Sequence, residues 1–299
     1  MNGAKLLVTG STGQLGRRVI EILLEKNLRV RGGTRQQSKL NSPGPGGVEF
    51  VIADFDEPQT LERAFVGVDR LLLISTSSYS NRFRQHKNAI DAAVNAGVKH
   101  IVYTSFVTAP LKTFRSPHWQ VHNQTEDYIA DSGVSFTILR NNLYFEVLPL
   151  LTTGIGGGTW KHAFSEPGRP GKGGIALVAR EDCARAAASV LSSNSTVNAV
   201  WTVTGPAVVT ADEIAAYVSA ARGSLHRAEA VTAQELRNEL RVAFARSETL
   251  RAHIDDLITF HSQAAASFMS AVTPDVKRLT GRPPLSVEDW IRANKDAFA

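Results

Sequence analysis

The sequence predicts an α/β protein with a Rossmann-type, doubly wound parallel sheet and a smaller, mainly helical C-terminal region. Two observations lead to this prediction. Apolar runs of strand length alternate with helix-length segments from the N-terminus, and a glycine turn follows the first run. Parallel strands need long crossover connections, which helices supply, and the right-handed crossover rule then favours a doubly wound sheet.

The expected strands are short apolar runs bounded by turn residues. They cover residues 5–8, 28–31, 48–52, 70–74, 100–103 and 134–139. A further strand near residues 199–204 is expected to return to the same sheet. Helices are expected between them, at residues 15–26, 58–65, 81–95 and 117–132. The last of these helices has Ser116 as a candidate N-cap and Gly133 as a candidate helix end.

The pattern changes after about residue 150, so we divide the chain into a main domain, residues 1–152, and a smaller region, residues 153–299. Residues 152–174 contain eight glycines and two prolines, which indicates loop or hairpin structure. This segment is interpreted either as a mobile cover over a site or as an ordinary surface connection. Further helices are expected at residues 181–192, 211–222, 233–241, 247–268 and 290–298. Ser286 and Asp289 resemble a capping box before the last of them.

Composition and charge exclude several classes of protein. With 43% hydrophobic and 20% charged residues, the chain can form a packed core. The net charge of +5 is spread without a basic run, so neither nucleic acid nor a membrane is an expected partner. The single cysteine, Cys183, excludes an intramolecular disulfide. With no long apolar stretch and no space for a signal peptide, a cytoplasmic protein is expected.

The strongest chemical signal is the sequence GSTGQLG, which follows the first expected strand and opens the first expected helix. Its G-x-x-G-x-x-G spacing departs from the commoner G-x-G-x-x-G. In this context Gly10 permits a tight turn, Gly13 lets the backbone approach a pyrophosphate, and Gly16 lets helix and strand pack closely. The helix start and its dipole favour a diphosphate. The whole turn is therefore expected to bind a dinucleotide: Gly10, Ser11, Thr12, Gly13, Gln14, Leu15 and Gly16.

The end of the second strand distinguishes NADP(H) from NAD(H). NAD enzymes place a carboxylate there for the ribose 2′-hydroxyl, but residues 31–39 contain no Asp or Glu. A carboxylate would repel a 2′-phosphate, whereas a guanidinium forms charged hydrogen bonds with it. Arg35 is therefore the expected phosphate clamp for NADP(H). Lys39 either adds a longer-range charge or simply lies in solvent.

Polar residues also follow the other expected strands, at the edge where open α/β sheets bind ligands. Asp54 is a candidate acceptor for the adenine amino group, with Phe55 beside the ring. The remaining candidates for cofactor binding at this edge are Ser75, Thr76, Thr104 and Asn142.

Together these residues resemble the NmrA-like branch of the atypical short-chain dehydrogenases, and within it the quinone oxidoreductases and triphenylmethane reductases. The likeness spans nearly the whole chain. Besides Arg35, its matching segments are VTGSTGQLG (8–16), ADFDEP (53–58), LLLIS (71–75), AGVKHIVYTS (96–105), ILRNNLY (138–144) and LTGRPPLSVEDW (279–290). The resemblance implies a Rossmann core, NADP(H), a small-molecule substrate, and a substrate cleft formed with residues 153–299.

Classical short-chain dehydrogenases use a Tyr-x-x-x-Lys pair for proton transfer, but lysine follows none of the five tyrosines at that spacing. The resemblance points instead to His122, where the quinone and dye reductases also carry histidine. An imidazole with a pKa of about 6.5 can donate a proton or hydrogen bond as hydride arrives. The alternative is a histidine that only bonds a helix or cofactor oxygen. Phe106, Tyr144 and Phe145 are candidates for substrate binding, although core packing accounts equally well for the last two.

A metal site is not expected. His118, His122 and Glu126 share helical i, i+4 spacing, but the sequence lacks H-E-x-x-H and cysteine-rich surroundings. The leading hypothesis is an NADPH-dependent oxidoreductase that transfers hydride to a conjugated electrophile such as a quinone. Two alternatives stay open: an NADP-sensing regulatory protein without significant turnover, and a biosynthetic reductase of an aromatic or polyketide intermediate. A homodimer is compatible with the sequence.

Overall fold

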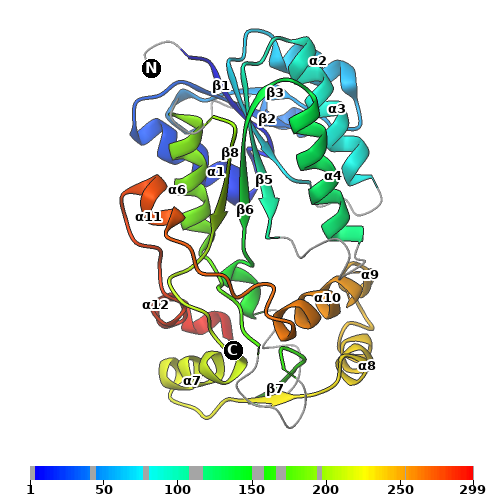
Figure 1. Ribbon diagram of the computed structural model, residues 1–299, viewed down its shortest axis with the longest axis vertical. Helices are drawn as coiled ribbons and strands as arrows, with labels where there is room; N and C mark the ends of the chain where they lie inside the picture. Colours follow the sequence, from blue (N-terminus) through cyan, green and yellow to red (C-terminus); the bar gives the residue numbers. More distant parts are fainter. Residues whose placement is uncertain are drawn as a thin grey trace.

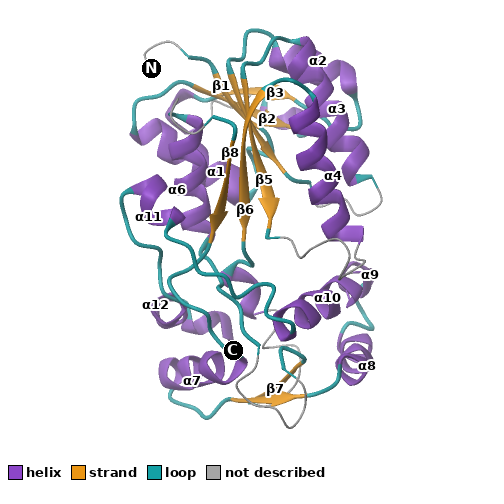
Figure 2. Cartoon of the chain, in the orientation of Figure 1, coloured by secondary structure: helices purple, strands orange, loops and turns teal. Residues whose placement is uncertain are grey.

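The computed structural model describes residues 4–40, 45–76, 81–107, 117–149, 158–165, 173–193, 197–252 and 254–298. Its centre is a seven-stranded parallel sheet in the order β3-β2-β1-β4-β5-β6-β8. Helices cover both faces of this sheet (Figure 2). The strand order reverses at β1, which pairs with β2 on one side and β4 on the other. The Rossmann-type, doubly wound sheet expected from the sequence is confirmed.

The strands agree with the expected ones to within a few residues. They are β1 (Leu6–Val8), β2 (Val30–Thr34), β3 (Glu49–Ile52), β4 (Arg70–Ile74), β5 (His100–Phe106), β6 (Ser135–Asn141) and β8 (Ala199–Val203). The second strand extends beyond its expected end because Gly32, Gly33 and Thr34 pair with β3. The two glycines interrupt the apolar pattern, so the sequence did not indicate this extension. The strand expected near residues 199–204 does return to the sheet, where β8 pairs with β6.

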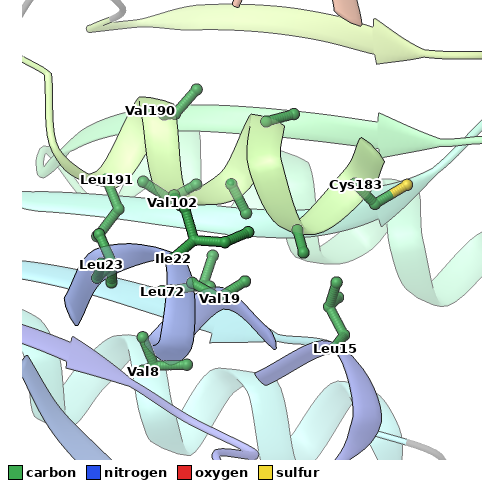
Figure 3. Close-up of a cluster of buried hydrophobic side chains, with 14 of the residues drawn as sticks. Val8, Leu15, Val19, Ile22, Leu23, Leu72, Val102, Cys183, Val190 and Leu191 are labelled. Atoms are coloured by element: carbon green, nitrogen blue, oxygen red, sulfur yellow. The ribbon is translucent and has the colours of Figure 1, made fainter. Parts of the chain in front are cut away.

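One face of the sheet is covered by α1 (Gln14–Glu25) and α6 (Arg180–Leu191), with α11 (Asp275–Thr280) packed against α6. Apolar side chains of α1 and α6 meet over the strands (Figure 3). Cys183 lies in this cluster, and burial raises the pKa of its thiol well above the usual range. A thiol held in its neutral form fits the expected role of a small packing residue.

The other face carries α2 (Pro58–Phe65), α3 (Arg82–Asn95) and α4 (Pro117–Asp131), as Figure 1 shows. Leu61, Phe65, Ile90 and Ile129 are fully buried beneath these helices. Soon after α4, Gly133 adopts a left-handed conformation with φ of 77°, as its sequence position suggested. The candidate N-cap Ser116 lies outside the described residues.

The C-terminal region contains α7 (Ala211–Arg222), α8 (Ala233–Ala243), α9 (Glu248–Ala252), α10 (Ile254–Ala265) and α12 (Val287–Ala293). It lies at the carboxyl ends of β5, β6 and β8 (Figure 1). Short 3-10 turns complete the chain: η1 (Gln37–Lys39), η2 (Pro45–Gly47), η3 (Phe145–Val147) and η4 (Lys295–Phe298).

Several expectations for this region were wrong in detail. A parallel pair of strands, β7 (Thr159–His162) and β9 (Arg227–Ala230), was missed. The helix expected over residues 247–268 is two helices, α9 and α10, and ends at Ala265. The helix expected over residues 290–298 begins earlier, because Ser286 accepts from the Asp289 amide and starts α12 at Val287. Of the glycine-rich segment, residues 152–157 and 166–172 lie outside the described residues, so its interpretation as a cover or a connection stays open.

The chain crosses between the two regions more than once. Helix α6, strand β8 and helix α11 all follow residue 152, yet they pack on or within the large sheet. The division at residue 152 therefore remains an interpretation of the sequence. In the part of the chain that the structure describes, no helix is long and apolar enough to cross a membrane.

Candidate active site

The glycine turn connects β1 to α1 at the carboxyl edge of the sheet. Gly10 has a φ of +57°, which L side chains rarely adopt. A Cβ atom on Gly16 would lie 2.3 Å from the Gly10 carbonyl oxygen, so this position requires glycine. Gly13 is the N-cap of α1 and no side chain caps the helix. The amides of the first turn therefore remain to bind an anion, which is the arrangement that a diphosphate needs.

A pocket of about 800 Å³ opens beside this turn, at the carboxyl ends of β1, β2, β3 and β4. Its lining includes the following residues that the sequence singled out: Gly10, Thr12, Gly13, Arg35, Asp54, Phe55, Ser75 and Thr76. Other lining residues were missed: Gly33, Thr34, Gln36, Ala53, Asp56, Ile74, Asn81 and Gln85. Most of the missed residues end or directly follow the same strands, so the switch point of the sheet could have pointed to them. Asn81 and Gln85 instead belong to the start of α3.

The rest of the glycine turn supports the pocket from behind or beside it. The Ser11 hydroxyl and amide both donate to the Gly33 carbonyl, at 2.8 and 3.1 Å, which ties the turn to β2. Leu15 is buried in the cluster between α1 and α6 (Figure 3). Gln14 is exposed at the start of α1. None of the three, nor Gly16, is among the residues that line the pocket.

Three more candidates for cofactor binding do not line the pocket. Lys39 is exposed in η1. The Thr104 hydroxyl accepts from the Ser75 amide at 3.0 Å and joins β5 to the end of β4. The Asn142 side chain donates to the Met269 carbonyl at 2.9 Å and accepts from the Leu143 amide at 2.8 Å. Asn142 therefore holds the end of β6 to the C-terminal region.

Charge in the pocket favours an anion at the end of β2. Arg35 is exposed there and makes no ion pair or side-chain hydrogen bond within the described residues. The nearby Asp56 carboxylate accepts from Gln85 at 2.7 Å and from Arg84 at 2.6 Å. These hydrogen bonds lower the pKa of Asp56, with a smaller contribution from the charge of Arg35. Because Arg84 already neutralises this carboxylate, the Arg35 guanidinium remains available for a ligand.

Volume alone would not identify this site. A hollow of about 870 Å³ lies at the opposite edge of the sheet, beside Lys5, Asn27 and Arg29. Its lining includes Gly46 and Gly47 of the short turn η2, but no residue from the start of an α-helix. The amides of α1 and the open guanidinium therefore distinguish the pocket at the carboxyl edge.

His122 lies on α4 and is 4% exposed. Its Nδ1 atom is 2.8 Å from the hydroxyl of Tyr103 on β5. The Tyr103 ring is fully buried and packs edge-on against His86 of α3. The sequence did not reveal this cluster, because Tyr103 lacks the lysine partner that marks a classical catalytic tyrosine and meets His122 only through the fold.

The three expected substrate residues lie in different surroundings. Phe106 is half-buried between His122 and Phe260 of α10, with ring centroids 6.2 and 5.7 Å away. It therefore lies where the sheet edge meets the C-terminal region. Phe145, by contrast, is fully buried and packs on Trp290 in the core of that region.

Tyr144 lies at the end of β6. Its hydroxyl accepts from Asn141 at 3.0 Å, and the Arg180 guanidinium lies 5.2 Å from the ring centroid. Burial raises the pKa of this tyrosine.

A partly buried ion pair fixes the helix that carries His122. Arg140 donates to both carboxylate oxygens of Glu126, at 2.6 and 3.1 Å, and the Ser105 hydroxyl donates to the same carboxylate at 2.5 Å. These contacts join α4 to β5 and β6. The carboxylate of Glu126 is therefore already occupied by hydrogen bonds. Within the described residues, no group of three potential metal ligands occurs.

The parallel sheet with its switch point, the glycine turn, and the open arginine after β2 define a dinucleotide-binding protein of the Rossmann class. The model of the NmrA-like family matches residues 2–268, and the chain belongs to this family. The family resemblance of the sequence is thus confirmed.

The chain is similar to several characterised oxidoreductases. It is 35% identical to quinone oxidoreductase 2 of Escherichia coli over 224 residues, which cover 73% of this chain and 74% of the relative. The structure of an NADPH-dependent quinone oxidoreductase from Escherichia coli complexed with NADPH superposes with a TM-score of 0.85 and 28% identity, covering 97% and 99% of the two chains. Triphenylmethane reductase from Citrobacter sp. also gives a TM-score of 0.85, at 29% identity over 98% and 99%.

Proposed function

We propose that this protein is an NADPH-dependent oxidoreductase that reduces a conjugated small-molecule electrophile such as a quinone. The observation that carries the proposal is the open guanidinium of Arg35 in the same pocket as the uncapped start of α1. The similarity to an oxidoreductase crystallised with NADPH supports the same coenzyme. When bound, this coenzyme supplies a hydride from its nicotinamide ring.

The pocket residues fit NADP(H) by their chemistry. The uncapped first turn of α1 offers its amides to the diphosphate, and Arg35 offers its guanidinium to the 2′-phosphate. Asp54 and Phe55 line the same pocket, and we assign them to the adenine. The buried Ser75 hydroxyl makes no regular hydrogen bond to another described residue, so a bound ligand could supply one.

The reacting end of the site lies toward α4 and α10. We assign His122 the role of donating a hydrogen bond to the substrate oxygen, and Phe106 the role of packing against a flat substrate. Phe260 extends the aromatic surface from the C-terminal region. Hydride addition to a quinone gives a stabilised hydroquinone anion. Holding the substrate in place therefore supplies most of the rate enhancement.

A turnover assay tests the proposal. Purified protein is mixed with NADPH and one acceptor from a panel of quinones, triphenylmethane dyes, imines and simple ketones, and the loss of reduced-nicotinamide absorbance is recorded. We expect turnover with quinones or dyes, and a His122→Ala variant that loses turnover but binds NADPH as before. No turnover with any acceptor would reject the enzymatic proposal.

The panel also separates the alternatives. Tight NADPH binding without turnover, together with capture of a partner protein, would favour an NADP-sensing regulator. Turnover confined to aromatic or polyketide intermediates would favour a biosynthetic reductase. We further propose that the protein acts in the cytoplasm on a dissolved substrate without nucleic acid; light scattering would show whether it is a homodimer.

A further inference from the structure

We propose that Tyr103 is a positioning residue that fixes the tautomer of His122 with its hydrogen on Nε2, and thereby selects quinone-like acceptors over simple ketones. The inference rests on the proposed function, in which His122 faces the substrate oxygen. Its basis is a buried chain of polar side chains from β5, α3 and α4: Tyr103, His86, Thr125 and His122.

The protonation of His86 follows from a backbone group. Its Nε2 atom lies 3.2 Å from the Thr76 amide nitrogen, which can only donate. Nε2 is therefore the accepting nitrogen. Burial lowers the pKa of His86 to about 3, and the charge of Arg82 acts in the same direction. The ring is thus neutral and carries its hydrogen on Nδ1.

Because Nδ1 of His86 carries a hydrogen, Tyr103 cannot donate to it. This hydrogen goes to Thr125 Oγ1, 2.9 Å away, because the Thr125 hydroxyl itself donates to the Val121 carbonyl at 2.7 Å. The Tyr103 oxygen lies 3.5 Å from the same nitrogen and can only be a second acceptor there. The Tyr103 hydrogen must therefore point elsewhere.

The Nδ1 atom of His122, 2.8 Å from the Tyr103 oxygen, is the acceptor that remains. With the opposite assignment, the buried Tyr103 hydroxyl would have no acceptor in regular hydrogen-bond geometry among the described residues, because its two such contacts are the Nδ1 atoms of His86 and His122. Burial raises the pKa of Tyr103; the charge of Glu126 adds to this, whereas the hydroxyls of Ser75 and Thr125 and the charge of Arg82 oppose it. The net rise keeps Tyr103 protonated at neutral pH.

A neutral His122 in this tautomer assists a reaction as a hydrogen-bond donor. If it released the Nε2 hydrogen completely, either an imidazolate or, after transfer from Tyr103, a buried tyrosinate would remain, and both are costly. Hydride addition to a quinone delivers two electrons and one hydrogen, oxidises the nicotinamide, and forms a hydroquinone monoanion. The Nε2–H group stabilises that anion, which then takes its proton from water. Hydride addition to a simple ketone forms an alkoxide, a much stronger base that requires a complete proton donor.

The tautomer can be measured directly in the wild-type protein without coenzyme. Long-range ¹H–¹⁵N NMR spectra of histidine-labelled protein distinguish protonated from unprotonated ring nitrogens, and a His122→Asn variant assigns the signals. We expect His122 to carry its hydrogen on Nε2 and His86 on Nδ1. A His122 ring protonated on Nδ1 would overturn the proposal, even if the enzyme proves active.

A pair of tyrosine variants tests the effect on turnover. Tyr103→Phe should lower the quinone kcat by about tenfold, equivalent to ~1.4 kcal/mol, with KM changed by less than about twofold, and should move the His122 nitrogen signals. Tyr128→Phe is the matched control, since Tyr128 lies on α4 with His122 but its hydroxyl bonds Asp91 and Lys87. Equal losses in both variants, or unchanged His122 signals in Tyr103→Phe, would contradict a positioning role.

The substrate preference and the presence of turnover are tested separately. We expect wild-type kcat/KM to be much higher for quinones than for simple ketones, and equal values would refute the predicted selection. If no acceptor is turned over, the proposed function fails. In that case the NMR assignment still decides whether Tyr103 sets the tautomer of His122.

Discussion

Replacing Arg35 with alanine tests the coenzyme preference most directly. The side chain follows β2, lines the pocket beside Gly10 and Gly13, and makes no ion pair within the described residues. The fold therefore does not depend on its charge. We expect Arg35→Ala to leave the melting temperature unchanged and to weaken NADPH selectively.

The size of the effect follows from the exposure of the guanidinium. Hydrogen bonds to charged groups contribute about 1.5–3 kcal/mol, whereas exposed ion pairs contribute about 0–1 kcal/mol. Arg35 is exposed, but Asp56 does not compete strongly for it because Arg84 already pairs with that carboxylate. An intermediate value of about 2 kcal/mol corresponds to about 30-fold weaker NADPH binding. NADH lacks the 2′-phosphate, so its dissociation constant should change by less than about twofold.

Calorimetric titration of both coenzymes against wild type and Arg35→Ala measures this difference. Arg29→Ala is the matched control, because Arg29 is also exposed and directly precedes β2 at the opposite edge of the sheet. Added salt should reduce the wild-type preference for NADPH. Equal losses for NADPH and NADH, or a similar loss in Arg29→Ala, would refute the assignment of Arg35.

Two further substitutions test the turn and the buried histidines. Gly16→Ala places a Cβ 2.3 Å from the Gly10 carbonyl oxygen. We therefore expect the free energy of unfolding, measured in urea, to fall by about 1–3 kcal/mol and NADPH to bind more weakly. Unchanged NADPH binding would contradict the role of the turn. Burial lowers the pKa of His261 to about 3, and the charge of His162 adds to this. Its contribution to stability is therefore complete above about pH 6.5 and is lost as the pH falls toward 3. His261→Gln should flatten the pH dependence of unfolding by about 1.4 kcal/mol per pH unit in this range, and an unchanged slope would show that His261 titrates normally.

Features encoded by neighbouring residues were predictable. The turn after β1 needs glycine at Gly10, which has a left-handed φ, and at Gly16, which lies close to the Gly10 carbonyl oxygen. Both glycines fall within seven consecutive residues, so the motif can be recognised in the sequence. The absence of Asp and Glu from residues 31–39, around Arg35, can likewise be read directly from neighbouring residues. The helix expected over residues 211–222 has the observed bounds of α7, and Thr210 and Glu213 form a capping box at its start.

Features that depend on distant partners were not predictable. The β7–β9 pair joins Trp160 to Ala228 across the C-terminal region, and the alternation in these short strands is too brief to mark them. Asn142 looked like one more polar residue at the ligand edge, but its side chain bonds Met269, 127 residues away in the chain. Burial of Phe145 against Trp290 was likewise decided by packing.

Three properties could be read from the residues alone: the formation of a parallel α/β sheet, the position of its glycine turn, and the positive charge that follows the second strand. These properties depend on backbone conformation, apolar periodicity and residue chemistry, all of which act over a few residues. The contact of Tyr103 with His122, and the lack of a carboxylate paired with Arg35 among the described residues, became known only from the folded chain. Both depend on how strands and helices from separate parts of the sequence pack together.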